Sequence, residues 1–248
     1  MKALVTGASS GIGRDIAKEL SKKGYELILV ARNKEKLEET QKELVTNSKI
    51  ICMDLSNNEN CIKLKELTGN VDVLVNNAGF GDFGSFEETD LNKELDMIKT
   101  NIMAMHILTK IYLKDMKKKD KGYILNVASI AGFLPGPLMS TYYATKAYVV
   151  SLTEGISEEL RRSKSNVKIS ILCPGPVKTN FNNVANVKFS IPSQSSEYVA
   201  KKAVEGMLKN KLIIIPGVKI KMVKFFSKIV PDKMLAFFSY NMQHRKYG

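Results

Sequence analysis

The sequence is poor in the residues that most often bind metals or form disulfides. Its 248 residues include no tryptophan, two histidines and three cysteines. Cys52, Cys61 and Cys173 are scattered without a CxxC pair, which argues against a disulfide scaffold and a zinc site, so we expect buried free thiols. His106 and His244 are far apart in sequence, and His106 lies in an apolar helical pattern that favours a structural role. We therefore expect no metal centre.

Long apolar segments are also missing. No run of about 18 apolar residues occurs, so the sequence predicts no transmembrane helix. The apolar stretch at the N-terminus ends at a glycine after Thr6, which makes it too short for the apolar region of a signal peptide. These two absences predict a cytoplasmic protein, and an apolar content of 44% is ordinary for a chain with a hydrophobic core.

Acidic residues are in the minority, and the basic excess is unevenly distributed. The formal net charge is +13, and residues 218–248 carry seven lysine or arginine residues against one acidic residue. Such charge attracts nucleic acids, anionic lipids and phosphorylated ligands alike, so by itself it selects no partner. Because no nucleic-acid-binding motif accompanies the charge, we expect no nucleic-acid partner.

Residues 218–248 predict a basic amphipathic C-terminal extension. Lys221, Lys224 and Lys228 fall on one helical face, whereas Met222 and Phe226 fall on another. Such a face most often packs on its own domain or on a second subunit, which is the interpretation we favour. A basic amphipathic helix can also lie on an anionic membrane, and this peripheral contact is the alternative.

Apolar strand patterns and helical patterns alternate along the chain. Strands are expected at residues 3–6, 26–31, 49–52, 72–75, 122–127, 167–172 and 212–215, and helices at 12–23, 33–44, 59–67, 91–118, 142–163 and 196–209. Apolar strands separated by helices predict a parallel sheet that is covered on both faces. Right-handed crossovers then predict a doubly wound, seven-stranded α/β fold, and we expect residues 1–248 to form one domain.

A glycine-rich turn joins the first expected strand to the first expected helix. Residues 6–13 have the sequence TGASSGIG. Small residues let the backbone approach a pyrophosphate, and a helix N-terminus offers unpaired N–H groups and a partial positive charge. The turn therefore predicts a bound dinucleotide, and an ordinary tight turn is the alternative.

The end of the second expected strand bears on which dinucleotide binds. An acidic residue there would bind the ribose 2′-hydroxyl of NAD(H), whereas a basic residue accommodates the 2′-phosphate of NADP(H). This chain has Arg32 and no acid at that place, so we expect NADP(H) in preference to NAD(H). Arg14, in the first expected helix, either contributes to this site or is simply exposed.

Ser129, Tyr142 and Lys146 form the pattern most specific for chemistry. Tyr142 and Lys146 are four residues apart on one expected helix, and Ser129 follows the fifth expected strand. A serine hydroxyl can hold a carbonyl oxygen, and a tyrosine hydroxyl can protonate it or accept a proton in the oxidative direction. An ordinary tyrosine pKa of about 10 is too high for a base at pH 7. A cation about 4 Å away contributes up to roughly 4 kcal/mol, so we expect Lys146 to lower the pKa of Tyr142 by about two to three units. Tyr143 is the competing proton donor.

Five motifs occur in an order that is typical of one family. They are TGxxxGxG at residues 6–13, NNAG at 76–79, Ser129, the pair Tyr142 and Lys146, and PG at 174–175. In these motifs the chain resembles the short-chain dehydrogenase/reductase family, in its single-domain branch with a Rossmann fold. The resemblance extends over roughly residues 1–180, and the family spacing selects Tyr142 over Tyr143 as the proton donor.

The resemblance also implies roles for individual residues. The implied catalytic residues are Tyr142, Lys146, Ser129 and Asn101, of which Asn101 would kink the long helix and support a water that leads to Lys146. Together with Arg32, the expected cofactor-binding residues are Gly7, Ser9, Ser10, Gly11, Ile12, Gly13, Asp54, Leu55, Asn77, Ala78, Gly79, Tyr142, Lys146, Pro174, Gly175, Val177 and Thr179.

The implied activity is the interconversion of a ketone or aldehyde and an alcohol with NADP(H). Three expected substrate loops, at residues 80–86, 133–139 and 176–197, are rich in apolar side chains, and these either wall the pocket or simply pack the loops. We expect a carbonyl reductase for an apolar small molecule, such as a 3-oxoacyl, aromatic or steroid-like carbonyl, acting as a homodimer or homotetramer. The alternative is a non-catalytic dinucleotide-binding regulator or scaffold of the same fold.

Overall fold

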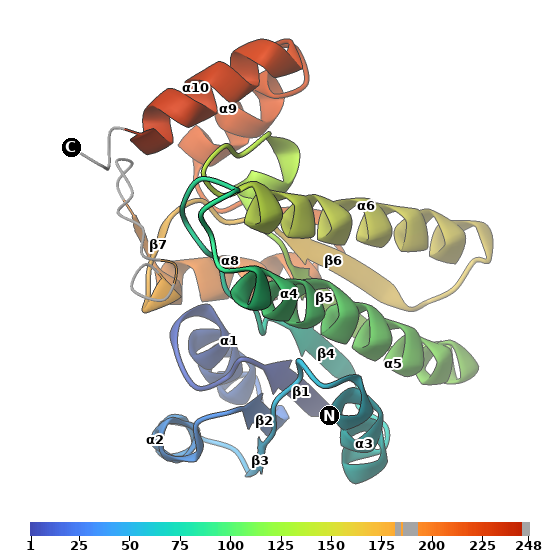
Figure 1. The fold of residues 1–248 in the computed structure, drawn as a ribbon. Helices are drawn as coiled ribbons and strands as arrows, with labels where there is room; N and C mark the ends of the chain where they lie inside the picture. The colour runs from blue at the N-terminus through green and yellow to red at the C-terminus, as the bar shows by residue number, and fades with distance from the viewer. Residues whose placement is uncertain (182–184, 186–192, 245–248) are drawn as a thin grey trace.

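The computed structural model describes residues 1–181, 185 and 193–244, and its centre is a parallel β-sheet (Figure 1). The sheet has seven strands in the order β3-β2-β1-β4-β5-β6-β9, and every neighbouring pair is parallel. The doubly wound fold that the sequence predicts is therefore confirmed. The strands are β1 (Lys2–Thr6), β2 (Glu26–Ala31), β3 (Ser48–Cys52), β4 (Val73–Asn76), β5 (Tyr123–Val127), β6 (Lys168–Leu172) and β9 (Ile213–Ile214).

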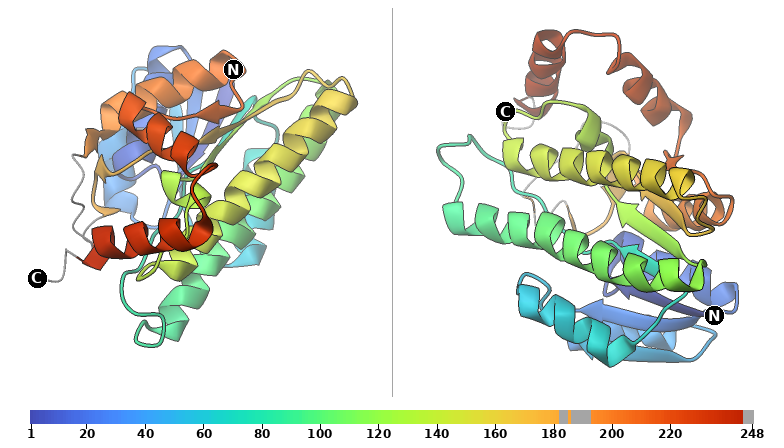
Figure 2. Two further views of the ribbon diagram at one scale, coloured as in Figure 1. Left: turned by 90° about the horizontal axis from the view of Figure 1, so that it is seen from above. Right: turned by 90° about the vertical axis from the view of Figure 1, so that its right-hand side faces the viewer.

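Helices cover both faces of the sheet, as the view from above shows (Figure 2, left). Alternate residues of β1 explain the two layers: Val5 belongs to a buried cluster with α1 and α8, whereas Leu4 belongs to one with α3 and α5. The helices flanking the sheet are α1 (Gly11–Lys22), α2 (Lys34–Lys42), α3 (Asn58–Thr68), α4 (Leu91–Ile98), α5 (Met105–Lys119), α6 (Ser140–Arg162) and α8 (Ser196–Leu208).

The chain order of the strands reverses between β1 and β4. β2 lies on one side of β1 and β4 lies on the other, so the loops after β1 and β4 leave the sheet in opposite directions. In open α/β sheets, ligands bind in the crevice that this reversal opens at the carboxyl ends of the strands. The topology thus indicates a binding crevice beside the glycine-rich turn, which follows β1.

The predicted element boundaries hold to within a few residues, with three differences. The expected long helix 91–118 contains a π-helical segment, η1 (Lys99–Ala104), between α4 and α5. The last strand pairs over two residues, and two short strands that the sequence pattern did not predict, β7 (Val177–Lys178) and β8 (Gln194–Ser195), pair outside the main sheet. Strands of two residues are too short to give a period-two pattern.

The expectation of three buried thiols is correct for two of them. Cys61 and Cys173 are buried, whereas Cys52 is exposed. Cys52 is the last residue of β3, an edge strand with no further strand beyond it in the sheet. Its thiol donates a hydrogen bond to the carbonyl oxygen of Arg32 at 3.0 Å. Within the described ranges, no cluster of metal-binding side chains is found.

The C-terminal segment forms two further helices, α9 (Val218–Phe226) and α10 (Asp232–His244). Figure 1 and the right-hand view of Figure 2 show both helices at one end of the molecule, beyond α6. Neither these helices nor any other in the described part of the chain is long and apolar enough to cross a membrane.

Candidate active site

A single cavity of about 480 Å³ lies at the carboxyl ends of the strands and joins most of the predicted site residues. It runs from the glycine-rich turn after β1 to the start of α6, along the crevice that the strand order opens. Residues that the sequence predicts and that line it are Gly7, Ser9, Ser10, Gly11, Ile12, Arg32, Leu55, Asn77, Ala78, Gly79, Ser129, Tyr142, Lys146, Pro174, Gly175, Val177 and Thr179.

The glycine-rich turn needs its glycines for steric reasons. Gly7 and Gly11 have φ values of +64° and +54°, in the left-handed region that other residues rarely adopt. A Cβ atom at Gly13 would overlap the carbonyl oxygen of Gly7, so only glycine lets α1 begin this close to the turn. Ser10 is the N-cap of α1 but makes no side-chain capping hydrogen bond, and the first turn of α1 holds no acidic residue. This helix end therefore suits an anionic ligand.

Asn77 and Thr6 fasten the turn to the end of β4. The Asn77 side-chain amide donates to the carbonyl oxygens of Thr6 and Gly7, at 3.0 and 3.2 Å. In return, the Thr6 hydroxyl oxygen accepts from the backbone N–H groups of Asn77 and Ala78, at 2.9 and 3.0 Å. These four hydrogen bonds hold the glycine-rich turn in position against the end of β4.

Tyr142 and Ser129 meet at the other end of the cavity. Ser129 follows β5 and caps the short 3-10 helix η2 (Ile130–Phe133), where its hydroxyl accepts from the N–H of Ala131 at 3.2 Å. Tyr142 lies in the first turn of α6, and the Ser129 hydroxyl is close enough to the phenol to lower its pKa. The two hydroxyl groups therefore converge on one point at the cavity wall, where a carbonyl oxygen could accept from both.

The pKa of Tyr142 does not follow the sequence-based expectation. Burial raises this pKa above its ordinary value of 10.0, more than the hydrogen bond from Ser129 lowers it. Burial also lowers the pKa of Lys146 from 10.5 to about 8. The pKa of Tyr142 is thus raised in the protein by itself where the sequence predicted a fall, because desolvation dominates. The Lys146 nitrogen lies 5.7 Å from the ring centre and does not reverse this direction.

Tyr143, the competing proton donor, also lines the cavity, but its hydroxyl has a different partner. Its ring meets that of Tyr142 edge to face, with 6.1 Å between centres, and its hydroxyl oxygen accepts from the Gln243 side chain of α10 at 3.2 Å. The hydroxyl of Tyr143 therefore holds a helix of the C-terminal segment, whereas that of Tyr142 faces Ser129. This difference supports the assignment of Tyr142 as the proton donor.

Asn101 lies in the π-helical segment η1, and its side chain makes three hydrogen bonds. Its amide donates to the carbonyl oxygen of Phe80 at 2.8 Å and to the hydroxyl of Thr145 at 3.1 Å, and its oxygen accepts from the N–H of Phe80 at 3.0 Å. The inserted residue of a π segment breaks the regular helical ladder, which lets Asn101 turn its side chain toward the loop after β4. Its role in supporting a water near Lys146 stays a prediction.

A few predicted residues lie outside the cavity lining. Gly13 packs against the backbone of Gly7 in the turn. Asn101 makes its hydrogen bonds to Phe80 and Thr145. Asp54 follows β3, and its carboxylate accepts from the N–H of Ser56 at 2.9 Å, so its contact with adenine stays a prediction. Arg14 also lies away from the lining and pairs with Asp15 at 3.3 Å, which favours the simpler of its two interpretations.

The structure adds lining residues that sequence analysis missed. Lys36, in the first turn of α2, joins Arg32 at the glycine-turn end of the cavity. The sequence pattern did not indicate Lys36, because it belongs to a highly charged helix whose side chains are expected to face solvent. Its spacing of four residues from Arg32 is the signal that could have identified it. Ile220, Val223 and Met242, from α9 and α10, line the opposite end.

Apolar side chains of the three predicted loops line the Tyr142 end of the cavity. Of the expected loop residues, Phe80, Leu134, Met139 and Phe181 line it. Four other expected residues lie outside the described part of the chain: Val184, Val187, Phe189 and Ile191. Phe86 is exposed and Asp82 pairs with Lys93 at 2.6 Å, so the first loop contributes to the wall mainly through Phe80.

Comparison with known proteins agrees with this geometry. The sequence pattern of the short chain dehydrogenase family matches residues 1–188, so the chain belongs to that family. It is 36% identical over 204 residues to a very-long-chain 3-oxoacyl-CoA reductase from Anas platyrhynchos, covering 77% of this chain and 64% of that one. It is 32% identical over 245 residues to estradiol 17-beta-dehydrogenase 11 from Macaca fascicularis, covering 94% of this chain and 80% of the relative.

Solved structures of the same family match most of this chain. A short-chain dehydrogenase from Sphingobium yanoikuyae in complex with NADPH has a TM-score of 0.81 at 27% identity, with 88% of each chain covered. A family member from Burkholderia phymatum in complex with NAD has a TM-score of 0.82 at 26% identity, with 90% of this chain and 91% of that one covered. The protein is thus an oxidoreductase acting between alcohol and carbonyl groups, and its fold binds a nicotinamide dinucleotide.

Proposed function

We propose that the protein is an NADP(H)-dependent oxidoreductase that interconverts an apolar ketone or aldehyde and its alcohol, acting as a carbonyl reductase. The observation that carries the proposal is one continuous cavity with two chemically different ends. Arg32 and Lys36 line one end, and Ser129, Tyr142 and Lys146 line the other. Binding and chemistry can therefore occur along one extended cofactor.

The residues at the glycine-turn end fit the diphosphate and adenosine part of the cofactor. The glycines leave room for the diphosphate at the N-terminus of α1. Arg32 and Lys36 are exposed cations, and neither pairs with an acidic side chain among the described residues. They are therefore available to a 2′-phosphate, which an acidic side chain at this position would repel.

At the other end, each side chain has a distinct part in the reaction. The bound nicotinamide supplies the hydride for reduction or accepts it in oxidation. Ser129 donates a hydrogen bond to the substrate carbonyl oxygen, and Tyr142 gives that oxygen its proton. Because burial keeps the pKa of Tyr142 high, this residue holds its proton at neutral pH and is ready to act as an acid. Lys146, which donates to the carbonyl oxygen of Val127 at 3.0 Å, supplies positive charge beside the developing phenolate.

An apolar substrate is supported by the wall that faces Tyr142. Phe181 lies with its ring centre 5.3 Å from that of Tyr142, and Met139 belongs to the same buried cluster. Apolar side chains of this kind favour an acyl, aromatic or steroid-like carbonyl over a sugar. Relatives named for 3-oxoacyl-CoA and estradiol substrates agree with this chemistry.

The test pairs two adjacent tyrosines. Tyr142→Phe should abolish NADPH oxidation across a panel of ketones and aldehydes while leaving NADPH affinity within about threefold, because only the proton donor is removed. Tyr143→Phe is the matched control and should retain turnover. Full activity in Tyr142→Phe would refute the assignment. Binding of NADPH with no turnover of any carbonyl by the wild-type protein would instead favour the non-catalytic alternative.

A further inference from the structure

The C-terminal helices expose large apolar side chains that the core does not cover. Between 51% and 64% of the surface of each of these six residues is exposed, and together we name them the C-terminal apolar surface: Met222, Phe225, Phe226, Ile229, Phe237 and Phe238. They come from α9, from α10 and from the link between the two helices. Single exposed apolar residues are ordinary, but a group of this kind within one short segment marks an interaction surface.

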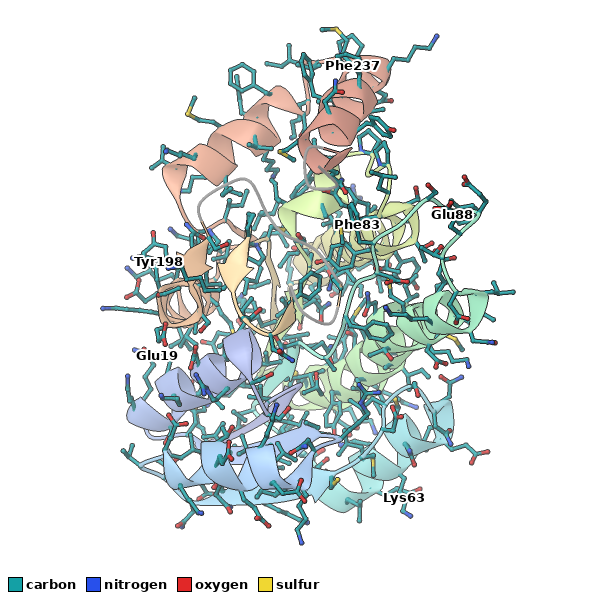
Figure 3. The ribbon with its side chains drawn as sticks, turned by 60° about the vertical axis from the view of Figure 1, so that its left-hand side comes forward. Glu19, Lys63, Phe83, Glu88, Tyr198 and Phe237 are labelled. Atoms are coloured by element: carbon teal, nitrogen blue, oxygen red, sulfur yellow. The ribbon has the colours of Figure 1, made fainter. Side chains whose placement is uncertain are left out.

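This surface lies at the outer end of the molecule. Figure 3 shows Phe237 at the end opposite Lys63, directed away from the sheet. The same helices also have an inner side, because Ile220 and Leu235 are buried and Val223 lines the cavity. Packing on the chain's own domain, one of the two arrangements that the sequence favoured, thus accounts for the inner side of α9 and α10. It leaves the outer side without a partner among the described residues.

Positive charge surrounds the apolar side chains. Lys219, Lys221, Lys228 and Lys233 are exposed, and none of them forms an ion pair with an acidic side chain in the described ranges. Asp232 is the one acidic residue between positions 218 and 248. A surface of aromatic side chains with lysines around them matches the interface of an anionic bilayer, where rings enter the headgroup region and ammonium groups stay among the phosphates.

A second copy of the chain fits this surface less well. A two-fold contact would place the same patch on both subunits, so that lysines would face lysines with a single acid on each side to offset them. We therefore propose that the C-terminal apolar surface docks the protein onto an anionic membrane surface, with Phe225, Phe226, Phe237 and Phe238 inserted at the headgroup level.

Docking in this way would place the substrate end of the cavity close to the lipid. Val223 and Met242 line the cavity from the inner side of the same two helices whose outer side would meet the membrane. An apolar substrate dissolved in the bilayer would then have a short path to Tyr142. This consequence rests on the proposed function, whereas docking itself does not, so the two can fail separately.

The test is co-sedimentation of the full-length protein with vesicles, without substrate or cofactor. Binding should be strong on phosphatidylcholine mixed with phosphatidylserine, weak on phosphatidylcholine alone, and reduced by salt. The double variant Phe237→Ser, Phe238→Ser should lower binding at least about tenfold, because two rings no longer enter the headgroup region. Lys219→Glu with Lys221→Glu should remove the preference for the anionic vesicles.

Matched controls alter exposed residues elsewhere. Phe86→Ser with Leu91→Ser removes two side chains that are 66% and 67% exposed, and Lys23→Glu with Lys63→Glu makes the same change of charge on other faces. Both control variants should bind vesicles like the wild-type protein. Equal binding to neutral and anionic vesicles, or equal losses in test and control variants, would overturn the proposal. So would a phenylalanine variant that dissociates an oligomer in sedimentation velocity yet still binds vesicles, because a second copy would then be the occupant.

Discussion

Lys146 is an ammonium group buried beside Tyr142, and the free energy of burying it depends on pH. Its pKa is about 8 in the folded protein, compared with an ordinary value of 10.5 in an unfolded chain. Between these values the unfolded state binds more protons than the folded state, so the free energy of unfolding rises with pH in this window. Below about pH 8, the folded protein retains the charge and bears its full desolvation cost.

The effect is measurable as a difference between two proteins. Between pH 8 and pH 10.5, the wild-type protein should gain stability relative to Lys146→Met, by on the order of 3 kcal/mol at most. Urea unfolding of both proteins across this range checks the sign, since groups that titrate alike in both proteins cancel in the difference. A difference that stays constant with pH would contradict the assigned pKa.

Under the proposed function, Arg32 selects between the two dinucleotides. Arg32→Asp should lower the affinity for NADPH at least about tenfold and leave that for NADH unchanged or improved, because a carboxylate repels the 2′-phosphate and accepts from a ribose 2′-hydroxyl. Lys36→Ala should weaken NADPH binding by a smaller factor, since a lysine binds phosphate through a single charged group. Fluorescence titration with both cofactors measures the change.

The control for this prediction is Arg162→Asp, which makes the same change of charge at the far end of α6, where Arg162 pairs with Glu158. It should leave both affinities unaltered, apart from a weak effect of net charge. A tenfold preference of the wild-type protein for NADH over NADPH would contradict the role given to Arg32.

At the scale of elements, replacing two helical glycines with alanine should change the free energy of unfolding in opposite directions. Gly13→Ala should destabilise the protein by more than about 2 kcal/mol, because the added Cβ would overlap the backbone of Gly7. Backbone atoms cannot move aside as the end of a flexible side chain can. Gly155→Ala should stabilise it by about 1 kcal/mol, since Gly155 lies inside α6 with nothing within 4 Å of an added Cβ. Chemical denaturation of the two variants and the wild-type protein checks both signs.

The long helix formed by α4, η1 and α5 contains a feature that its apolar spacing does not predict. Its apolar spacing predicts a continuous helix, and the chain does run without a break from Leu91 to Lys119. The π segment at its centre lets Asn101 donate hydrogen bonds to Phe80 and Thr145, which are distant in sequence. A local pattern contains no information about partners of this kind.

For the whole molecule, the cavity is built from both ends of the chain. The glycine turn comes from its start, and Val223 and Met242 come from its last thirty residues or so. Val223→Ser with Met242→Ser should raise KM for apolar carbonyl substrates by roughly tenfold, because each lost apolar contact in a pocket weakens binding. NADPH affinity should stay within about threefold, since Val223 and Met242 line the end opposite the Arg32 site.

Steady-state kinetics with a carbonyl substrate and fluorescence titration with NADPH separate these effects. Phe225→Ser is a suitable control, because this side chain is 62% exposed on the outer side of α9 and is not among the cavity-lining residues. An equal rise in KM for Phe225→Ser would mean that the substitutions act by loosening the C-terminal helices rather than by altering the cavity wall.

Much of the architecture and of the cofactor site follows from the sequence alone. Alternating apolar strands and amphipathic helices determine a parallel sheet, because backbone hydrogen bonding and burial leave few other arrangements for such a pattern. The glycine turn was predictable for the same kind of local reason, since positive φ values and close backbone contacts require glycine. The same holds for the spacing of Tyr142 and Lys146 on one helix.

Other properties were decided only when distant segments came together. The pKa of Tyr142 rises where its spacing from Lys146 predicted a fall, because burial is a property of the assembled cavity and not of one helix. Tyr143 is distinguished from Tyr142 by Gln243, one hundred residues later in the chain. The outer side of α9 and α10 is exposed because the folded domain covers only their inner side. Local periodicity determines which residues share a face, but only tertiary packing decides what that face meets.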